Sequence, residues 1–282
     1  MAVSGGVDSM VLLDLLAEQP EVELIVAHFN HGIRPDSQKD EALVGRRAKR
    51  LGLKFEAGYG RLGRRASEET ARNARYEFLY SLQEKYQIRS VITAHHQDDL
   101  IETALLNLLR GTGRQGLAAI SSNKNVTRPL LSYSKREIKA YAAKNQIEWR
   151  EDATNSDNKY LRNRLRSSLV NLTDYNRQEL VKNIDKVAKI EAKLKKEIAS
   201  LSQYYSDGAT IDRASFNLLP AELADELVVD WLRRFGAPEF DRKTVNRVSL
   251  ALRTAKPNTV QPVRGDVQLK ISRKTAQFSH TV

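Results

Sequence analysis

The stretch that decides the fold is Ser4-Gly5-Gly6-Val7-Asp8-Ser9, close to the start of the sequence. The apolar residues 1–3 precede it, and an apolar pattern over residues 10–16 follows it. This order predicts a strand, a tight glycine turn and the first turn of a helix. Such a turn directs backbone N–H groups and the positive end of the helix dipole toward one point, which suits a phosphate. Gly5 and Gly6 allow the backbone to close around that anion.

Asp8 is the unusual member of this loop. A carboxylate beside a bound phosphate repels it unless a cation lies between them, so the pattern favours Mg²⁺ shared between Asp8 and the phosphates. No lysine follows the glycines, which separates this loop from the Walker loop. A plain strand–helix turn with a capping serine would explain the same residue types without any ligand, and the types alone leave both interpretations open.

Composition narrows the class of protein. A length of 282 residues predicts about two domains, and 41% hydrophobic residues are enough for a buried core. No apolar run approaches the ~20 residues that span a bilayer, and we expect no secretory leader and no membrane partner. The absence of cysteine excludes disulfides and thiol chemistry and fits a cytosolic protein. The net charge of +11 favours a polyanion partner such as nucleic acid, although a basic solubility surface would also explain it.

Short apolar stretches alternate with helical patterns along the first half of the chain, which predicts a parallel α/β sheet. We expect strands over residues 22–29, 53–57 and 90–94, and helices over residues 37–51 and 67–86, the latter capped by Ser67. Polar residues follow two of the strands, where open α/β sheets bind ligands. For His28 a satisfied sheet-end histidine is the alternative, and for His31-Gly32 a plain turn.

Two charged pairs have the spacing of one helix face. Asp99 and Glu102 are three positions apart at a predicted helix start, which suits Mg²⁺ or a substrate ammonium. A capping aspartate and a salt-bridged glutamate are the alternative roles. Arg72 and Arg75 share a face in the same way and suit a phosphate, unless they only pair with a nearby glutamate on a solvated face.

The second half of the chain has a different pattern. Residues 152–159 predict a loop, and the arginines that follow it mark a basic helix start. Residues 178–205 carry an apolar stripe flanked by lysines, which predicts one long helix that breaks at residues 206–208. Helices over residues 218–235 and 242–253 and a hairpin of residues 260–263 with 267–271 complete a small, mostly α domain.

The series of motifs resembles the bacterial tRNA(Ile)-lysidine synthases, which are N-type ATP pyrophosphatases of the PP-loop superfamily. The resemblance covers roughly residues 2–172. The first strand is shorter than in that family, so either the sequence starts inside the natural protein or the strand is very short. Residues 168–172 lack the usual proline, and we expect a local change in how that helix ends. The motifs that carry the resemblance are the loop at residues 4–9, His28-x-x-His31-Gly32, Ala71-Arg72-x-x-Arg75-Tyr76, His95-His96-x-Asp98-Asp99-x-x-Glu102-Thr103, Arg110-Gly111-Thr112-Gly113, Gly116-Leu117, Arg128-Pro129-Leu130-Leu131, Lys135-Arg136-Glu137-Ile138, Trp149-x-x-Asp152, Asn155, Asp157 and Arg162-Asn163-x-x-Arg166.

The patterns and the resemblance together imply a Rossmann-like, adenine nucleotide alpha-hydrolase-like catalytic domain over residues 1–172. A linker helix over 173–206 and a small tRNA-binding domain over 207–282 would follow. The implied reaction ligates free L-lysine to the wobble cytidine of CAU-anticodon tRNA(Ile) through an adenylated cytidine, with release of AMP and pyrophosphate, in the cytoplasm. The implied roles are ATP binding by Ser4, Gly5, Gly6, Val7, Asp8, Ser9, His28, His31 and Gly32, Mg²⁺ binding by Asp8, lysine binding by Asp99 and Glu102, catalysis by Asp8, Asp99, Glu102, Arg162 and Arg166, and tRNA or phosphate binding by Arg72, Arg75 and Arg110.

Two other functions fit part of the sequence. A tRNA sulfur transferase would share the first loop, but such enzymes generally use a thiol or a metal cluster and the sequence has no cysteine. A non-catalytic RNA-binding protein would explain the basic charge, but the loop at residues 4–9 retains the full pattern.

Overall fold

The structure is a computed structural model, and it describes residues 1–32, 36–60, 63, 67–118, 125–151, 165, 168–169, 172–207, 209–237 and 240–281. Contacts between residues divide the chain into two compact units, Met1–Ala188 and Lys189–Val282. The boundary falls within the long helix α8 (Asp174–Tyr205), which the sequence predicted as one helix. Among the described helices, none is both long enough and apolar enough to cross a membrane.

Parallel strands form the centre of the first unit. Strand β1 (Ile25–Asn30) pairs with β2 (Lys54–Tyr59), and β3 (Val91–Ile92) pairs with β4 (Val126–Thr127). Residues 1–3 lie between these two pairs, because the Val3 N–H donates to Ala27 O at 2.8 Å and the Ala2 N–H donates to Ile92 O at 2.8 Å. The first strand is therefore present where it was predicted, but it amounts to a single bridge between Ala2 and Ala27.

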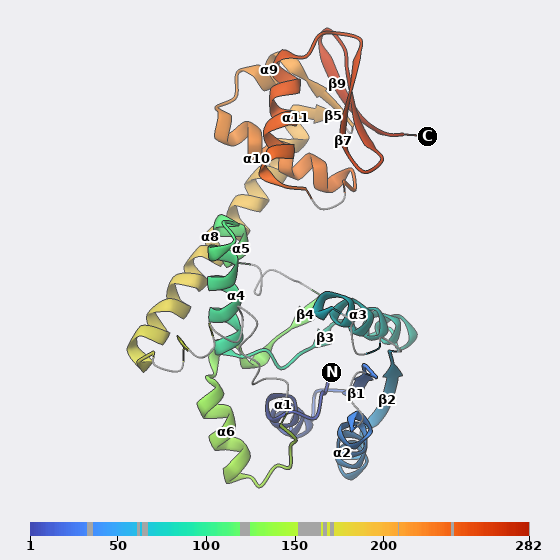
Figure 1. Ribbon diagram of the computed structural model, residues 1–282, viewed down its shortest axis with the longest axis vertical. Coiled ribbons are helices and arrows are strands. Elements are labelled where there is room, and N and C mark those ends of the chain that lie inside the picture. The colour runs from blue at the N-terminus through green and yellow to red at the C-terminus, as the bar shows by residue number, and fades with distance from the viewer. Residues whose placement is uncertain are drawn as a thin grey trace. The chain divides into compact units, whose positions relative to one another are not determined.

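Helices cover both faces of this sheet, as the alternation of strands and helices predicted (Figure 1). Figure 1 shows α2 (Ser37–Arg50) and α3 (Glu68–Lys85) on opposite sides of β1 and β2. Consecutive residues of β1 point to different cores: Val26 belongs to the cluster that includes α1 (Val7–Ala17) and α2, and Ala27 belongs to the cluster that includes α3. This arrangement buries most of β1 between two helical layers.

The first turns of three helices are fixed by capping interactions. Ser67 Oγ accepts from the Thr70 N–H at 3.1 Å at the start of α3, as predicted. Helix α6 (Lys135–Lys144) begins with a capping box, in which Ser134 Oγ accepts from the Glu137 N–H at 3.3 Å and Glu137 Oε2 accepts from the Ser134 N–H at 2.7 Å. Helix α4 (Gln97–Leu109) begins where the Asp99 carboxylate accepts from the His96 N–H at 3.0 Å. Such caps satisfy backbone groups that a helix end leaves unpaired.

The connections create a crevice at one edge of the sheet. From residues 1–3 the chain passes outward through α1, β1, α2 and β2, and it then returns through α3 to β3 on the other side of residues 1–3. The direction of strand addition therefore reverses between residues 1–3 and β3. Ligands of open α/β sheets bind beyond the carboxyl ends of the strands at such a reversal. Here these ends lead into the glycine loop at residues 4–9 and into His95-His96.

The first unit also contains α5 (Gly113–Leu117) and the short 3₁₀ helix η1 (Pro129–Ser132). The elements that follow α8 belong to the second unit. An antiparallel sheet of order β5-β6-β9-β8-β7 packs with α9, α10, α11 and the C-terminal part of α8 around the fully buried Trp231 and Phe216. The predicted hairpin is confirmed as β7 and β8, whereas the other three strands were not predicted. The elements are β5 (Ser206–Asp207), β6 (Thr210–Asp212), α9 (Arg213–Asn217), α10 (Ala221–Arg234), α11 (Arg242–Thr254), β7 (Thr259–Arg264), β8 (Val267–Ile271) and β9 (Thr275–His280).

Candidate active site

The glycine loop is closed by its own serines. Ser9 Oγ accepts from the Ser4 N–H at 3.2 Å and donates to Gly6 O at 2.9 Å, and Ser4 Oγ accepts from the Gly6 N–H at 3.3 Å. Gly5 has φ +91°, and a Cβ there would lie 3.4 Å from the Cβ of Asp40. Only glycine adopts this conformation without strain. The loop therefore presents the first N–H groups of α1, which have no partner within the helix, at one point.

Asp8 lies in the first turn of α1, and its carboxylate is about a quarter exposed. Lys135 Nζ lies 2.6 Å from each of its two oxygens. Lys135 is the first residue of α6, so this ion pair joins the N-termini of two helices across the crevice. The Mg²⁺ role of Asp8 stays a prediction, and in the structure this carboxylate pairs with a lysine of the same chain.

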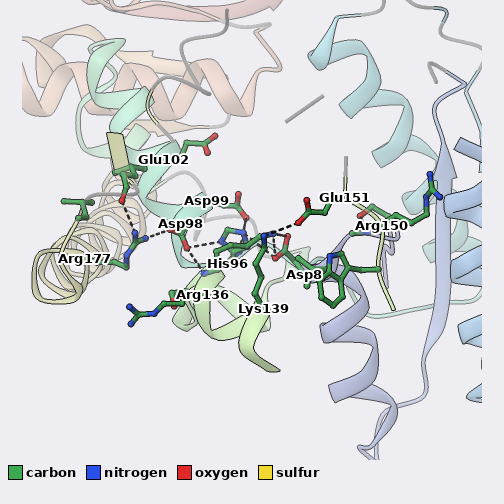
Figure 2. Close-up of a pocket in the computed structure, with 18 of the residues that line it drawn as sticks. Asp8, His96, Asp98, Asp99, Glu102, Arg136, Lys139, Arg150, Glu151 and Arg177 are labelled. Carbon is green, nitrogen blue, oxygen red and sulfur yellow. Dashed lines mark hydrogen bonds and ion pairs between the residues drawn. The ribbon is translucent and has the colours of Figure 1, made fainter. Parts of the chain in front are cut away.

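His96 is almost completely buried among three carboxylates. Its Nε2 lies 3.7 Å from an oxygen of Asp8 and 3.5 Å from an oxygen of Asp99, and its Nδ1 lies 3.6 Å from Asp98. Figure 2 shows Asp8, Asp98 and Asp99 gathered around His96. The imidazole thus separates the loop carboxylate from the carboxylates at the start of α4.

The other acidic residues of α4 differ in their surroundings. Asp98 accepts from the Lys135 N–H at 2.8 Å and pairs with Arg177 of α8, so it ties three helices together. Glu102 is only 3% exposed and lines the same cavity as Asp99. The predicted placement of Asp99 and Glu102 on one face of the helix start is therefore confirmed.

These residues surround a cavity of about 790 Å³ that lies entirely within the first unit. Its walls come from the glycine loop and from the N-terminal turns of α4, α6 and α8. Its lining carries both acidic and basic side chains, several of which pair with each other. Its charged lining includes Asp8, Asp99, Glu102, Lys135, Lys139 and Arg177.

A second cavity of about 410 Å³ lies at the carboxyl end of β1 and also reaches Ser4, Asp8 and Ser9. It brings together the residues that the sequence predicted for a nucleotide, namely His28, His31 and Gly32. The His28 Nδ1–H donates to Val3 O at 2.8 Å, which fixes the ring of this buried histidine. The two cavities meet at the glycine loop, so the loop can serve a ligand that extends into both.

His95 contributes a neutral ring to the second cavity. Its Nδ1 lies 2.9 Å from Thr93 Oγ1, and burial lowers the pKa of His95 to about 4 despite the nearby Asp99. The positive charges of Arg75 and Arg72 act in the same direction as burial. His95 is therefore uncharged at neutral pH.

The three arginines that were predicted to bind phosphate occupy different places. Arg75 lines the second cavity, and burial lowers its pKa, whereas Arg72 is exposed. Both guanidinium groups lie over the ring of Tyr76, at 4.8 Å for Arg72 and 5.5 Å for Arg75. Arg110 is exposed at the C-terminal end of α4, about 16 Å along the helix axis from Asp99. Arg110 is therefore not part of either cavity.

Comparison with known proteins identifies the family. A family model described as a PP-loop domain matches residues 1–173, which is more than half of the chain. The chain belongs to the PP-loop family. Membership implies that it binds ATP, and the PP loop is the glycine loop at residues 4–9.

The relatives with curated names are tRNA(Ile)-lysidine synthases. The protein from Exiguobacterium sibiricum is 34% identical over 271 residues, 92% of this chain and 63% of its own length. That from Rickettsia bellii is 31% identical over 299 aligned positions, 100% of this chain and 65% of its own length. The chain thus spans about two-thirds or less of the relatives it matches. The U34-tRNA thiolase NcsA from Methanococcus maripaludis has the same fold, with a TM-score of 0.57, 17% identity and coverage of 67% of this chain and 71% of its own.

Three residues at the PP loop received no role from the sequence, although Lys135 stands in one of the motifs that carry the resemblance. Lys135 pairs with Asp8 across 127 positions, and no local pattern reports such a contact. Arg150 braces the loop, since its N–H donates to Gly5 O at 3.0 Å, and Arg177 pairs with Asp98. The Ser134-x-x-Glu137 capping box would have placed Lys135 at the start of a helix. Arg162 and Arg166 lie outside the described residues.

The donor set at the PP loop fits a metal ion that a ligand helps to hold. Within the described ranges, no group of three or more histidines or carboxylates is arranged to bind a metal ion unaided. Asp8 offers a partly exposed carboxylate next to the phosphate-facing N–H groups of α1. Mg²⁺ commonly takes one or two carboxylates and completes its shell with phosphate oxygens and water. The site therefore suits Mg²⁺ that arrives with ATP.

Proposed function

We propose that this protein converts the wobble cytidine of CAU-anticodon tRNA(Ile) to lysidine, using ATP and free L-lysine. The observation that carries the proposal is that the PP loop and the acidic start of α4 line one cavity, with Asp8 and Asp99 each within 3.7 Å of the same His96 nitrogen. An ATP site and a site for an ammonium group are what this reaction needs side by side. The names of the relatives support the same substrate.

In the first step, the cytidine is activated because its C2 oxygen is a poor leaving group. The N–H groups at the start of α1 bind the phosphates of ATP, and His28, His31 and Gly32 surround the nucleotide in the second cavity. Asp8 would hold Mg²⁺, and the ion would supply positive charge to neutralise the departing pyrophosphate. The C2 oxygen then bonds to the α-phosphorus and pyrophosphate leaves.

In the second step, the ε-amine of lysine attacks C2 and AMP departs with the former C2 oxygen. The unperturbed pKa of a lysine amine is about 10.4, so it arrives as an ammonium and must lose a proton. Asp99 and Glu102 hold this ammonium, and one of them accepts the proton. We propose that Arg162 or Arg166 binds the leaving phosphate or the lysine carboxylate.

The remaining residues bind the nucleic acid. The net charge of +11 suits an RNA backbone, and exposed Arg72 and Arg110 are the candidates for phosphate contacts in the first unit, while Arg75 faces the nucleotide cavity. We propose a catalytic domain over residues 1–172, a linker helix over 173–206 and a tRNA-binding domain over 207–282. The cytidine must leave the anticodon stack, which a single-stranded loop allows. The cytoplasm, where tRNA is modified, is the proposed location.

The test is the overall reaction. Purified protein is incubated with ATP, radiolabelled lysine and the CAU-anticodon tRNA, and a matched tRNA with uridine at the wobble position serves as control. We expect AMP and pyrophosphate to be released and lysine to become attached only with the first tRNA. Release of ADP, or sulfur incorporation without lysine, would contradict the proposal. Binding of the tRNA without any ATP cleavage would favour a non-catalytic RNA-binding protein instead.

A further inference from the structure

The ion pair between Lys135 and Asp8 needs an explanation, because the same carboxylate is the proposed ligand of Mg²⁺. Both Asp8 oxygens lie 2.6 Å from Lys135 Nζ, and both side chains are partly exposed, at 37% for Lys135 and 26% for Asp8. A pair so exposed contributes little to stability. If this ion pair persisted when ATP binds, it would block the proposed metal site, because Lys135 occupies the carboxylate that the metal ion must reach.

The backbone of Lys135 is held by its neighbours, whereas its ammonium is held by the ion pair with Asp8. The Lys135 N–H donates to Asp98 at 2.8 Å, and the Ser134–Glu137 capping box fixes the turn around it. The flexible part is the four-carbon stem, which carries three donors in any direction. Asp8 lies in the first turn of α1, so the ammonium already stands beside the N–H groups that face the phosphates.

The neighbouring cations of the cavity have other partners. Lys139 pairs with Glu151 at 3.2 Å, and Arg136 pairs with Asp174 at 2.8 Å. Arg150 pairs with Asp36 and Asp40, and Arg177 pairs with Asp98. Among the cations that line this cavity in the described part of the chain, Lys135 is the one whose carboxylate partner belongs to the PP loop.

We propose that Lys135 is a pyrophosphate-binding residue that exchanges partners when ATP binds. Without nucleotide, the ammonium neutralises Asp8. When the metal ion and ATP enter together, the metal ion takes Asp8, and Lys135 turns to the β- and γ-phosphates, where it also neutralises the departing pyrophosphate. The inference rests on the proposed function only in requiring ATP phosphates at the PP loop.

A double-mutant cycle in the absence of metal tests this exchange. Inorganic pyrophosphate is titrated calorimetrically, in EDTA, into the full chain and into Asp8→Asn, Lys135→Gln and the double variant. Asp8→Asn releases the ammonium, so we expect it to tighten pyrophosphate binding about tenfold or more in the presence of Lys135. In the Lys135→Gln background, Asp8→Asn should tighten pyrophosphate binding much less, because it then removes only the repulsion between the Asp8 carboxylate and pyrophosphate. If Asp8→Asn tightens pyrophosphate binding equally with and without Lys135, the proposal is overturned.

The second arm adds Mg²⁺ and uses a matched control. Lys135→Gln should weaken pyrophosphate binding about tenfold to a hundredfold, whereas Lys139→Gln, the same change on the same helix and cavity wall, should not. Lys135→Arg, which keeps the charge, should restore most of the affinity. If Lys135→Gln and Lys139→Gln behave alike, the exchange does not occur.

The outcomes separate the two proposals. A wild-type protein that fails to bind pyrophosphate with Mg²⁺ overturns both. A wild-type protein that forms lysidine while Lys135→Gln binds pyrophosphate normally overturns only the exchange. If the wild-type protein forms no lysidine but the double-mutant cycle shows coupling between Asp8 and Lys135, the proposed reaction is contradicted and the partner exchange is supported.

Discussion

At the scale of single residues, the site depends on the partner that each carboxylate has. Asp8 meets Lys135, Asp98 meets Arg177, and Asp99 accepts from the His96 N–H at 3.0 Å. Spacing in the sequence was enough to predict that Asp99 and Glu102 share a helix face. It could not predict Lys135, because the pair with Asp8 forms only when two distant helices meet.

The first prediction concerns Asp8. Asp8→Asn should retain the fold, because the carboxylate is at a partly exposed helix start, and should abolish tRNA-dependent AMP formation by removing the Mg²⁺ ligand. The expected loss is several kcal/mol of transition-state stabilisation. Asp14→Asn, on the same helix, is the control: Asp14 pairs with Arg47, so it should lower thermal stability and leave the rate nearly unchanged. An Asp8→Asn rate equal to wild type would exclude the metal role.

The second prediction separates lysine binding from adenylation. If Glu102 holds the lysine ammonium, Glu102→Gln should raise the KM for lysine or slow the attack about tenfold to a hundredfold while adenylated tRNA accumulates. Asp99→Asn should give a mixed effect, because Asp99 lies near His96 and the PP loop as well. The measurement is a single-turnover assay that follows adenylated tRNA and lysidine separately. Slower adenylation with an unchanged dependence on lysine concentration would assign Asp99 and Glu102 to the nucleotide site instead.

The third prediction is a pH dependence from His95. Its pKa is about 4 in the folded protein and about 6.5 when unfolded, so the unfolded chain binds the proton more tightly. The free energy of unfolding should therefore fall as pH drops from about 6.5 to 4, by up to about 3 kcal/mol from this group. His95→Asn should lack that part of the decline in urea titrations across this range. Parallel curves for both proteins would show that His95 is not held neutral.

At the scale of elements, the predicted helices and strands of the first unit are present, but their lengths follow from tertiary pairing. β3 and β4 are two-residue strands, and residues 1–3 form one bridge, because neighbouring strands supply only those hydrogen bonds. In the second unit, β9 alternates buried Ala276 and Phe278 with polar residues. That is the period of a strand, but small and polar residues made the signal too weak to predict it.

The fourth prediction belongs to this scale. Asp98 joins α4 to the start of α6 and to α8, since it accepts from the Lys135 N–H and pairs with Arg177. Asp98→Asn should lower the free energy of unfolding by about 1–3 kcal/mol, because a partly buried guanidinium and an N–H lose a charged acceptor. Asp174→Asn is the control, since its pair with Arg136 is exposed and its loss should change little. Equal urea midpoints for the two variants would show that Asp98 does not stabilise the contact between these helices.

At the scale of the whole molecule, two units with separate cores serve one proposed reaction. The first unit holds both cavities, and the second unit, whose core surrounds Trp231, adds to the positive charge of the chain. The PP loop could be predicted because its glycines, serines and aspartate are contiguous. The geometry of the first cavity could not, because it depends on how α4, α6 and α8 meet around the loop.

The central claim is that the PP loop activates the tRNA rather than the amino acid, and labelling of the α-phosphate tests it most directly. The protein is incubated with α-labelled ATP and CAU-anticodon tRNA(Ile) without lysine. We expect the label to become attached to the tRNA, and to leave as AMP when lysine is added and lysidine forms. Label that appears on lysine in the absence of tRNA, or a tRNA that stays unlabelled while lysine is incorporated, would contradict the account.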